Sequence, residues 1–381
     1  MEEILEKKKC TGCSACANIC PKGAIELIKD NDEFKHPKIN QGKCINCGLC
    51  RRTCPVLNTR ENSSLNKCYV AYNKSEEVKK TSSSGGVFDA LAKNILEDGG
   101  IVIGAAFNNN MELNHVAIEK VSDLEKLKGS KYLQSNLDNI FSYIKKQLSN
   151  KKILFVGTPC QVAGLHAYLK KDYDNLICVD LFCHGVPSPK LFKKYINELE
   201  NDNNSKVVKY NFRDKKTGWD TYSNTITFKD NKKISELQIN NYYMKLFLAD
   251  IALRESCYNC GFKLGNKYSD ITLGDFWGVK KYYPKMYSKN GVSAIIINTE
   301  KGKKMFESIS NNLKYKECKL EEIIAGNPSL EHSGKYPTHR NEFFEDINKL
   351  SIKNLSQKYA GIPIIKRIKI KVKRIIKKLI R

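Results

Sequence analysis

The sequence predicts a small α+β module over residues 1–58, fused to an α/β body of one or two subdomains and followed by an amphipathic helix. Two observations carry this fold class. Eight of the 15 cysteines lie in the first 58 residues of the 381-residue chain. Apolar runs with strand and helix periods alternate through most of the residues that follow. The predicted divisions are 1–58, 67–148, 149–345 and 346–381, with a polar linker between the first two.

The eight N-terminal cysteines form two runs with the same spacing, C-x2-C-x2-C-x3-C-P. This spacing is typical of bacterial two-cluster ferredoxins, in which the fourth cysteine of each run binds the other 4Fe-4S cluster. The sequence therefore predicts one cluster held by Cys10, Cys13, Cys16 and Cys54, and a second held by Cys44, Cys47, Cys50 and Cys20. Two zinc knuckles are the alternative, but zinc takes four ligands per site and does not require the trailing Cys-Pro.

Composition places these cysteines in a reducing, cytoplasmic compartment. The N-terminus has no apolar signal region, which disfavours a disulfide framework, and the chain has no run of eighteen apolar residues. The net charge of +24 would suggest a nucleic-acid partner if it were spread evenly. Nine of the basic side chains lie in residues 362–381 without one acid, so no nucleic-acid partner is expected.

Strand and helix periods alternate through the body in chain order. Strands are expected at 68–72, 101–107, 152–156, 176–182 and 293–298, helices at 87–96 and 161–169, and a hairpin around Asp230-Asn231. Residues 152–182 form a βαβ unit, which predicts a parallel strand pair. A capping box at Ser122–Glu125 predicts the start of another helix.

Three polar, glycine-bearing segments stand where these strands and helices change over. Residues 81–86 precede a helix, so they can cap it or hold an anion at its N-terminus. Residues 129–135 combine a cation, a ring and an amide that suit a flavin or a nucleotide. Residues 157–161 follow a buried strand and open a helix, a position where α/β sheets bind ligands.

Four further cysteines are close to these segments or paired in the chain. Cys160 opens the helix after the strand at 152–156, and Cys183 follows the neighbouring strand. Cys257 and Cys260 form a C-x2-C pair, which fits half a zinc site, a redox dithiol or chance. Together the four match the ligand count of a cubane or of a tetrahedral zinc.

In order along the chain, these motifs resemble the coenzyme F420 hydrogenase/dehydrogenase family of beta subunits. The resemblance rests on SSGG at 83–86, GSKYLQS at 129–135, GTPCQ at 157–161, DLFCHGVPS at 180–188, the pair Cys257 and Cys260, and DITLGDFWG at 270–278. It implies an iron–sulfur flavoprotein body that binds FAD, and members of the family exchange hydride with the deazaflavin coenzyme F420. Many members of unknown substrate are encoded in surface-polysaccharide gene clusters.

Residue by residue, the resemblance implies that Cys160, Cys183, Cys257 and Cys260 bind a third 4Fe-4S cluster. It also implies contacts to FAD or to the deazaflavin from Ser83, Ser84, Gly85, Gly86, Lys131, Gln134, Ser135, Gly157 and Thr158. Lys131 is expected to stabilise negative charge on the reduced flavin, and His184 to relay a proton. Asp275, Phe276 and Trp277 are interpreted as packing, with stacking beside a cofactor as the alternative. Cys68, Cys178 and Cys318 are interpreted as thiols without a role.

The function predicted from these motifs is that of an oxidoreductase. Electrons would pass between a ferredoxin or another redox protein, the clusters and FAD, with hydride exchange to coenzyme F420 or another small substrate in surface polysaccharide biosynthesis. The alternative is a non-catalytic electron-transfer subunit of a partner enzyme. Residues 362–381 read as a basic amphipathic helix, which predicts a peripheral position on the anionic inner membrane leaflet. Packing on the body or on a protein partner is the alternative for this tail.

Overall fold

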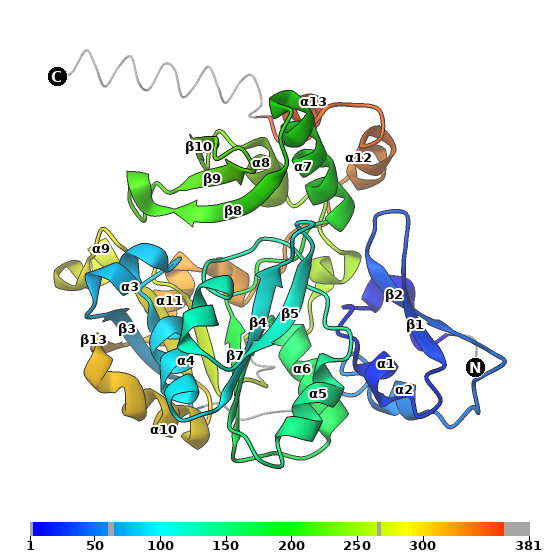
Figure 1. Ribbon diagram of the computed structural model, residues 1–381, viewed down its shortest axis with the longest axis horizontal. Coiled ribbons are helices and arrows are strands. Elements are labelled where there is room, and N and C mark those ends of the chain that lie inside the picture. The colour runs from blue at the N-terminus through cyan, green and yellow to red at the C-terminus, as the bar shows by residue number, and fades with distance from the viewer. Residues whose placement is uncertain (1–2, 60–64, 265–267, 362–381) are drawn as a thin grey trace.

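The structure is a computed structural model that describes residues 3–59, 65–264 and 268–361. A cysteine-rich module lies against one side of a larger α/β body, and a smaller three-stranded sheet lies at one end of that body (Figure 1). The tail predicted at 362–381 falls outside the described residues. Within the described ranges, no helix has both the length and the apolar content needed to cross a membrane.

The module repeats one backbone pattern in its two cysteine runs. Gly12 and Ser14 in the first run, and Asn46 and Gly48 at the equivalent positions of the second, all have left-handed backbone conformations. Glycine and asparagine tolerate this conformation best, which explains their presence in the loops. The elements of the module are η1 (Lys7–Lys9), α1 (Ala15–Ile19), β1 (Ile25–Lys29), β2 (Lys35–Ile39) and α2 (Leu49–Arg52), with β1 and β2 antiparallel.

An eight-stranded mixed sheet forms the centre of the body. Its order is β13-β3-β12-β11-β7-β6-β4-β5, and β4, β6, β7 and β11 run parallel to one another. Its strands are β3 (Lys67–Asn73), β4 (Ile101–Phe107), β5 (Leu113–Ile118), β6 (Ile153–Gly157), β7 (Leu176–Leu181), β11 (Ile271–Asp275), β12 (Ser293–Ile297) and β13 (Leu313–Cys318). Strands from both predicted ranges, 67–148 and 149–345, pair in this sheet, so the two ranges form one continuous body.

Helices cover both faces of the sheet, because its parallel strands are apolar on both sides. On β4, Val102 packs toward α4 (Val87–Glu97) and α10 (Glu300–Ile309), while Ile101 and Ile103 pack toward α5 (Ile140–Gln147) and α6 (Pro159–Leu169). The predicted βαβ unit is present, with β6 and β7 parallel and α6 between them in the chain. The remaining elements around the sheet are α3 (Glu76–Thr81), α9 (Val279–Tyr282), α11 (Leu320–Gly326), η2 (Val121–Lys126), η4 (Glu255–Asn259), η5 (Pro284–Met286), η6 (Ser310–Asn312) and η7 (Pro328–Leu330).

The smaller sheet has a separate aromatic core. Phe192, Phe212 and Tyr243 are buried there and contact one another. The hairpin predicted around Asp230-Asn231 is present, and Asn231 adopts the left-handed conformation that its turn requires. The elements are β8 (Val207–Asp214), η3 (Lys215–Thr217), β9 (Ser223–Phe228), β10 (Lys233–Leu237), α7 (Pro189–Asn203), α8 (Tyr242–Leu248), α12 (Arg340–Asp346) and α13 (Ile352–Tyr359).

Two local expectations about helix caps are wrong. The segment at Ser122–Glu125 is part of the short 3-10 helix η2, whose N-cap is Lys120 and which has no side-chain cap. The serines at 82–84 do not cap α4, because its N-cap is Gly86 in a left-handed conformation. Their hydroxyls bind elsewhere: Ser82 donates to the Val78 carbonyl, and Ser84 donates to the Val292 carbonyl. A carbonyl of the preceding helix α3 and the tertiary partner Val292 therefore outcompete the local capping pattern.

Candidate iron–sulfur and flavin sites

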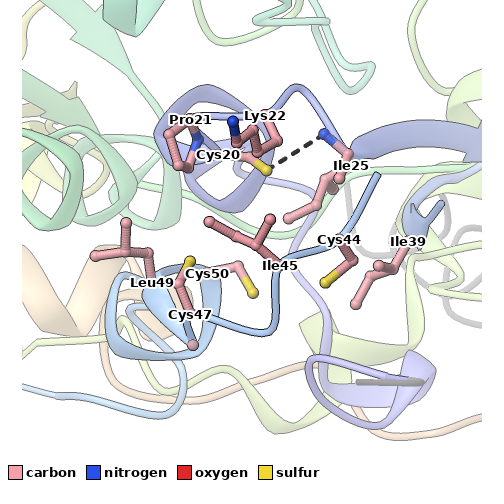
Figure 2. A pocket seen from close by; sticks show the side chains of 12 residues that line it. Cys20, Pro21, Lys22, Ile25, Ile39, Cys44, Ile45, Cys47, Leu49 and Cys50 are labelled. Atoms are coloured by element: carbon pink, nitrogen blue, oxygen red, sulfur yellow. Dashed lines mark hydrogen bonds between the residues drawn. The ribbon is translucent and has the colours of Figure 1, made fainter. Parts of the chain in front are cut away.

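The module contains two cavities, and each gathers one of the predicted cysteine sets. The cluster I cavity, with about 350 Å³ of empty space, is lined by Cys10, Cys13, Cys16 and Cys54. The cluster II cavity, with about 380 Å³, is lined by Cys20, Cys44, Cys47 and Cys50. Figure 2 shows the four sulfurs of the second set arranged around their cavity. The fold thus brings the fourth cysteine of each run to the cavity of the other run.

The residues lining these cavities fit 4Fe-4S clusters. Burial raises the pKa of Cys13 to about 12, so a thiolate at this position needs a positive partner such as iron. The hydroxyl of Thr53, next to Cys54, is buried and has no hydrogen-bond partner among the described residues. The Ala24 N–H donates to the Cys20 sulfur at 3.3 Å. In the described ranges, no three His, Cys, Asp or Glu side chains are grouped as a single metal ion would require.

The two cavities differ in their surroundings. Cluster I faces the body: Cys10, Cys13 and Cys54 are buried, and a Cβ added to Gly164 of α6 would lie 2.9 Å from the Cβ of Cys13. Glycine at 164 therefore permits the close approach of the module to α6. Cluster II faces outward, since Cys47 is exposed and none of its four cysteines is buried.

Arg254 joins the body to the cluster I loop, residues 10–16. It precedes η4 and is only 2% exposed, yet its side chain reaches into the module. Its Nε donates to the Cys10 carbonyl at 2.6 Å, and its terminal nitrogens contact the Lys35 carbonyl at 2.9 Å, the Gln134 side-chain oxygen at 3.1 Å and His36 Nδ1 at 3.3 Å. Although burial of Cys10 acts in the opposite direction, His36 and the Arg254 charge lower the pKa of that thiol.

The four cysteines of the predicted third set come from separate elements of the body. Cys160 lies in the first turn of α6, Cys183 follows β7, Cys257 lies in η4, and Cys260 ends η4. Burial is the main cause that raises the pKa of Cys160, with Cys183, Cys260 and Cys13 adding to it. Burial and the neighbouring Cys257 likewise raise the pKa of Cys183 to about 12. These electrostatic couplings indicate that the four thiols lie within electrostatic range of one another, and that Cys13 lies within range of Cys160.

Two of the three predicted flavin segments meet in space. The Ser83 hydroxyl accepts a hydrogen bond from the Ser130 N–H at 2.6 Å, which joins segment 81–86 to segment 129–135. The buried Arg213 donates to the Ser83 carbonyl at 3.3 Å and forms an ion pair with Asp275 at 2.9 Å. Around Gly129, which has a left-handed conformation, nothing lies within 4 Å of an added Cβ. The meeting point is therefore a polar, locally open turn in which Asp275 balances the charge of Arg213.

Other predicted flavin contacts are engaged in the protein itself. The Ser84 hydroxyl and the Gly85 N–H bind residues in and next to β12, and a Cβ at Gly85 would lie 2.7 Å from the Ala71 carbonyl oxygen. The Ser135 hydroxyl contacts His115 Nδ1 at 2.9 Å and accepts from the Gln161 amide at 3.0 Å.

The remaining predicted contacts lie on the module side or at the start of α6. The Gln134 amide donates to the Thr11 carbonyl at 2.9 Å, so this side chain lies at the module interface. Gly157 ends β6, and Thr158 caps α6 and contacts the Cys160 sulfur at 3.3 Å.

The two predicted catalytic side chains also have partners. Burial lowers the pKa of Lys131 to about 7, but its ammonium donates to the carbonyls of Lys126, Leu127 and Lys128 at 2.8–3.3 Å, contacts that favour the charged form. Lys131 thus closes the turn after η2. His184 Nε2 contacts an Asp250 carboxylate oxygen at 2.5 Å, which fixes the ring and gives a proton a defined place.

Two buried arginines and one histidine near these sites were not predicted from the sequence. Arg213 stands in the charged stretch Arg213–Lys216 and Arg254 precedes Glu255, and the partners described above lie 62 or more positions away in the chain. His36, on β2, contacts Arg254 and lies beside Cys10. One signal was present for Arg254: it directly follows the apolar run Ile251–Leu253 and stands three residues before Cys257.

A module with two four-cysteine cavities, docked on an α/β body, defines an iron–sulfur electron-transfer protein. Family models give the particular class. The model described as 4Fe-4S dicluster domain matches residues 9–58. The N-terminal and C-terminal models of the coenzyme F420 hydrogenase/dehydrogenase beta subunit match residues 68–141 and 150–323. The chain belongs to this family of beta subunits, and it is an iron–sulfur oxidoreductase.

Similar proteins come from Methanosarcina and Methanocaldococcus. An F(420)H(2) dehydrogenase subunit of Methanosarcina mazei is 24% identical over 335 residues, which are 83% of this chain and 86% of the relative. The coenzyme F420-dependent sulfite reductase of Methanocaldococcus jannaschii is 26% identical over 344 residues, 85% of this chain and 49% of that protein. A solved chain of the F420-reducing NiFe hydrogenase complex of Methanosarcina barkeri is 19% identical, with a TM-score of 0.49, over 80% of this chain and 95% of that one.

Proposed function

We propose that the chain transfers electrons between an external redox protein and an FAD site in the body, where hydride is exchanged with coenzyme F420 or another small substrate. The flavin, when bound, supplies the junction between one-electron and hydride chemistry. The clusters of the module and the third cysteine set supply the one-electron side.

One observation carries this proposal: the predicted redox sites follow one another from the surface inward. The cysteines of the cluster II cavity are exposed or half-buried, and the cluster I cavity is next to it and faces α6. Cys13 contacts α6 at Gly164, four residues after Cys160 of the third set. Thr158 lies two residues before Cys160 and belongs to the predicted flavin contacts. An electron can therefore move inward in short steps through protein-bound centres.

The residues of the chain have three tasks in this scheme. Arg254 holds the cluster I loop against the residues that lead into Cys257 and thus fixes the distance between the first and the third centre. Ser83, Ser130 and Arg213, whose charge Asp275 balances, form a polar turn that would hold a polar part of the flavin cofactor. His184 and Asp250 hold a proton beside Cys183 and can pass it on when charge changes at the site.

The deazaflavin is the first substrate to test, because the two similar proteins are named for coenzyme F420. A small sugar or glycan-lipid precursor is the second, as a role in surface polysaccharide biosynthesis stays a prediction from the resemblance. Membrane binding by residues 362–381 also stays a prediction, and flotation of anionic vesicles with and without the tail tests it.

The decisive experiment is anaerobic reconstitution followed by metal, flavin and turnover assays. We expect about twelve iron atoms per chain, extractable FAD, and oxidation of reduced coenzyme F420 coupled to reduction of a viologen dye. Cys160→Ser should lose about four iron atoms and the coupled reaction. Cys318→Ser is the control, because this thiol lies on β13, away from all three cysteine sets, and should retain both. Full iron content and activity in Cys160→Ser would refute the third centre.

A non-catalytic electron-transfer subunit is the second candidate, and the name of the Methanosarcina mazei relative as part of a dehydrogenase favours it. In that case the isolated, loaded chain would exchange electrons with dyes but would not oxidise reduced coenzyme F420. Turnover by the isolated chain separates the two candidates.

A further inference from the structure

The outward side of cluster II is predominantly positive. The segments that line or border its cavity, residues 20–26 and 38–52, contain one acidic residue, Glu26, and five basic ones: Lys22, Lys38, Lys43, Arg51 and Arg52. All five are exposed. Glu26 on β1 is the acid opposite Lys38 in the hairpin register, and no ion pair joins them in the described structure. We call these five residues, together with Ile45, the cluster II face.

The centre of this face is apolar and close to the sulfurs. The Ile45 side chain is 57% exposed and lies between two predicted ligands in the chain, Cys44 and Cys47 (Figure 2). Arg52 donates to the Cys47 carbonyl at 2.9 Å, which fixes one basic group directly beside the exposed cysteine. An apolar centre with a predominantly basic rim is the usual anatomy of a transient interface with an acidic protein.

The other cluster has no comparable surface among the described residues. Cluster I is covered by α6 on the Cys13 side and by Arg254 on the Cys10 side. The segment next to it, residues 3–9, mixes two acids with three lysines, and Glu6 pairs with Lys8 and Lys9. A carrier protein that approaches the module therefore reaches cluster II first, and it meets a surface of positive charge.

We propose that the cluster II face is the docking surface for an acidic one-electron carrier protein. The inference rests on the proposed function and deepens it by naming the point where electrons enter and the charge of the partner. In the transfer, the carrier is oxidised by one electron, and the cluster held by Cys20, Cys44, Cys47 and Cys50 is reduced by one electron. No proton or further reactant is needed in this step.

The test uses the reconstituted full chain and a small acidic bacterial ferredoxin as the probe. The double variant Lys22→Glu, Lys43→Glu reverses the charge of the face at two exposed positions. The matched control, Lys229→Glu, Lys232→Glu, makes the same change in charge on the exposed turn between β9 and β10, which belongs to the smaller sheet and not to the module.

The first readout is binding of the oxidised ferredoxin by calorimetry, which involves no turnover. At low ionic strength, we expect the face variant to bind at least about tenfold more weakly than the wild type. Added salt should weaken binding by the wild type but not by the face variant. The control variant should bind like the wild type. Equal losses in both variants, or none in either, would overturn the proposal. So would stronger wild-type binding to a basic cytochrome c of similar size.

The second readout separates this surface from the proposed function. A reduced viologen dye needs no docking surface, so it should reduce the clusters of both variants at wild-type rates, while the ferredoxin should reduce the face variant about tenfold more slowly. Dye-driven turnover without ferredoxin binding would leave the proposed function intact and refute the docking surface. If the protein bound no flavin and showed no dye-driven turnover, the proposed function would be refuted. The binding measurement would still test the docking surface on its own.

Sedimentation of the wild-type protein tests whether a second copy of the chain occupies this face. A monomer that binds the ferredoxin supports the proposal. A dimer that the face variant dissociates would assign the face to a second copy of the chain and overturn the proposal.

Discussion

Replacing Arg254 should detach the module from the body without unfolding the body. The guanidinium has four polar partners, and all of them belong to the module or to the segment at 129–135. Arg254→Met removes the charge and leaves the carbonyls of Cys10 and Lys35 without these donors. A buried acceptor that loses a charged donor costs about 1–3 kcal/mol, and the two together give about 2–6 kcal/mol.

This free energy concerns the docking of the module rather than the folding of the body, and other contacts also join the module to the body. Arg340 still pairs with Asp32 at 3.5 Å, and Ser188 still donates to the Asp32 carbonyl at 2.6 Å, so the module keeps a second point of attachment. A loss of about 4 kcal/mol raises the population of the undocked state by roughly a thousandfold. Undocking exposes the cluster I loop at Thr11 and Gly12.

The assay is anaerobic native-state proteolysis of the reconstituted protein, with cleavage in the cluster I loop as the signal. Cleavage should be roughly a thousandfold faster in Arg254→Met, and Arg254→Lys should lie between the two because it keeps the charge. The control is Lys206→Met, which removes the exposed ion pair with Glu200 and should change the rate little. An Arg254→Met protein that is cleaved at the wild-type rate would refute the assignment of docking to this residue. A body that unfolds together with the module would refute the separation of docking from folding.

Three further predictions concern neighbouring sites. Gly164→Val should push the module away from α6, because even a Cβ at this position would lie 2.9 Å from the Cβ of Cys13. Electron transfer from the module to the body, measured by freeze-quench spectroscopy, should be slower. A reduced viologen dye should still reduce the module. Burial lowers the pKa of His115 to about 4, so the unfolded state binds more protons than the folded state between about pH 4 and 6.5. The free energy of unfolding should therefore rise with pH across this window. Urea titrations of His115→Gln should show this rise reduced by up to about 3 kcal/mol. Cys54→Ser should damage the cluster of the first run rather than that of its own run, so the spectrum of cluster I should be lost while that of cluster II persists; the reverse pattern would refute the crossed ligand sets.

The elements that the sequence predicts well are those whose signal is local. The cysteine spacing is a property of about ten consecutive residues, and the loop geometry follows from it, with Gly12 and Gly48 in the left-handed conformation that the turns need. The buried strand at 101–107 is apolar along its whole length, and the structure places β4 there. The motifs at 157–161 and 180–184 end neighbouring parallel strands, so the chain order alone brings Cys160 and Cys183 to one edge of the sheet.

The features that the sequence does not predict depend on which of several partners is close in space. Nothing around Lys131 shows that its ammonium binds three carbonyls of the preceding turn rather than facing a cofactor. The serines at 82–84 have the composition of a helix cap, but the start of β12 and segment 129–135 offer them better partners. In each case the side chain has several possible partners, and only the tertiary structure decides among them.

The position of Arg254 explains why the module is docked in one orientation. Its backbone leads into η4, which contains Cys257, and its side chain binds the carbonyl of Cys10, the first cysteine of the other centre. Gly12, two residues on, has no room for a side chain: an added Cβ would lie 2.9 Å from the Gln134 amide and 3.0 Å from the Arg254 guanidinium. Rotating the module to bring cluster II toward the body would break these contacts, because Asn46 stands at the position equivalent to Gly12, and an added Cβ at Gly48 would meet only Arg52 of the module itself. The orientation of the module, with the cluster II cavity outside and the cluster I cavity against the body, is therefore held by one buried arginine and the glycine that contacts it.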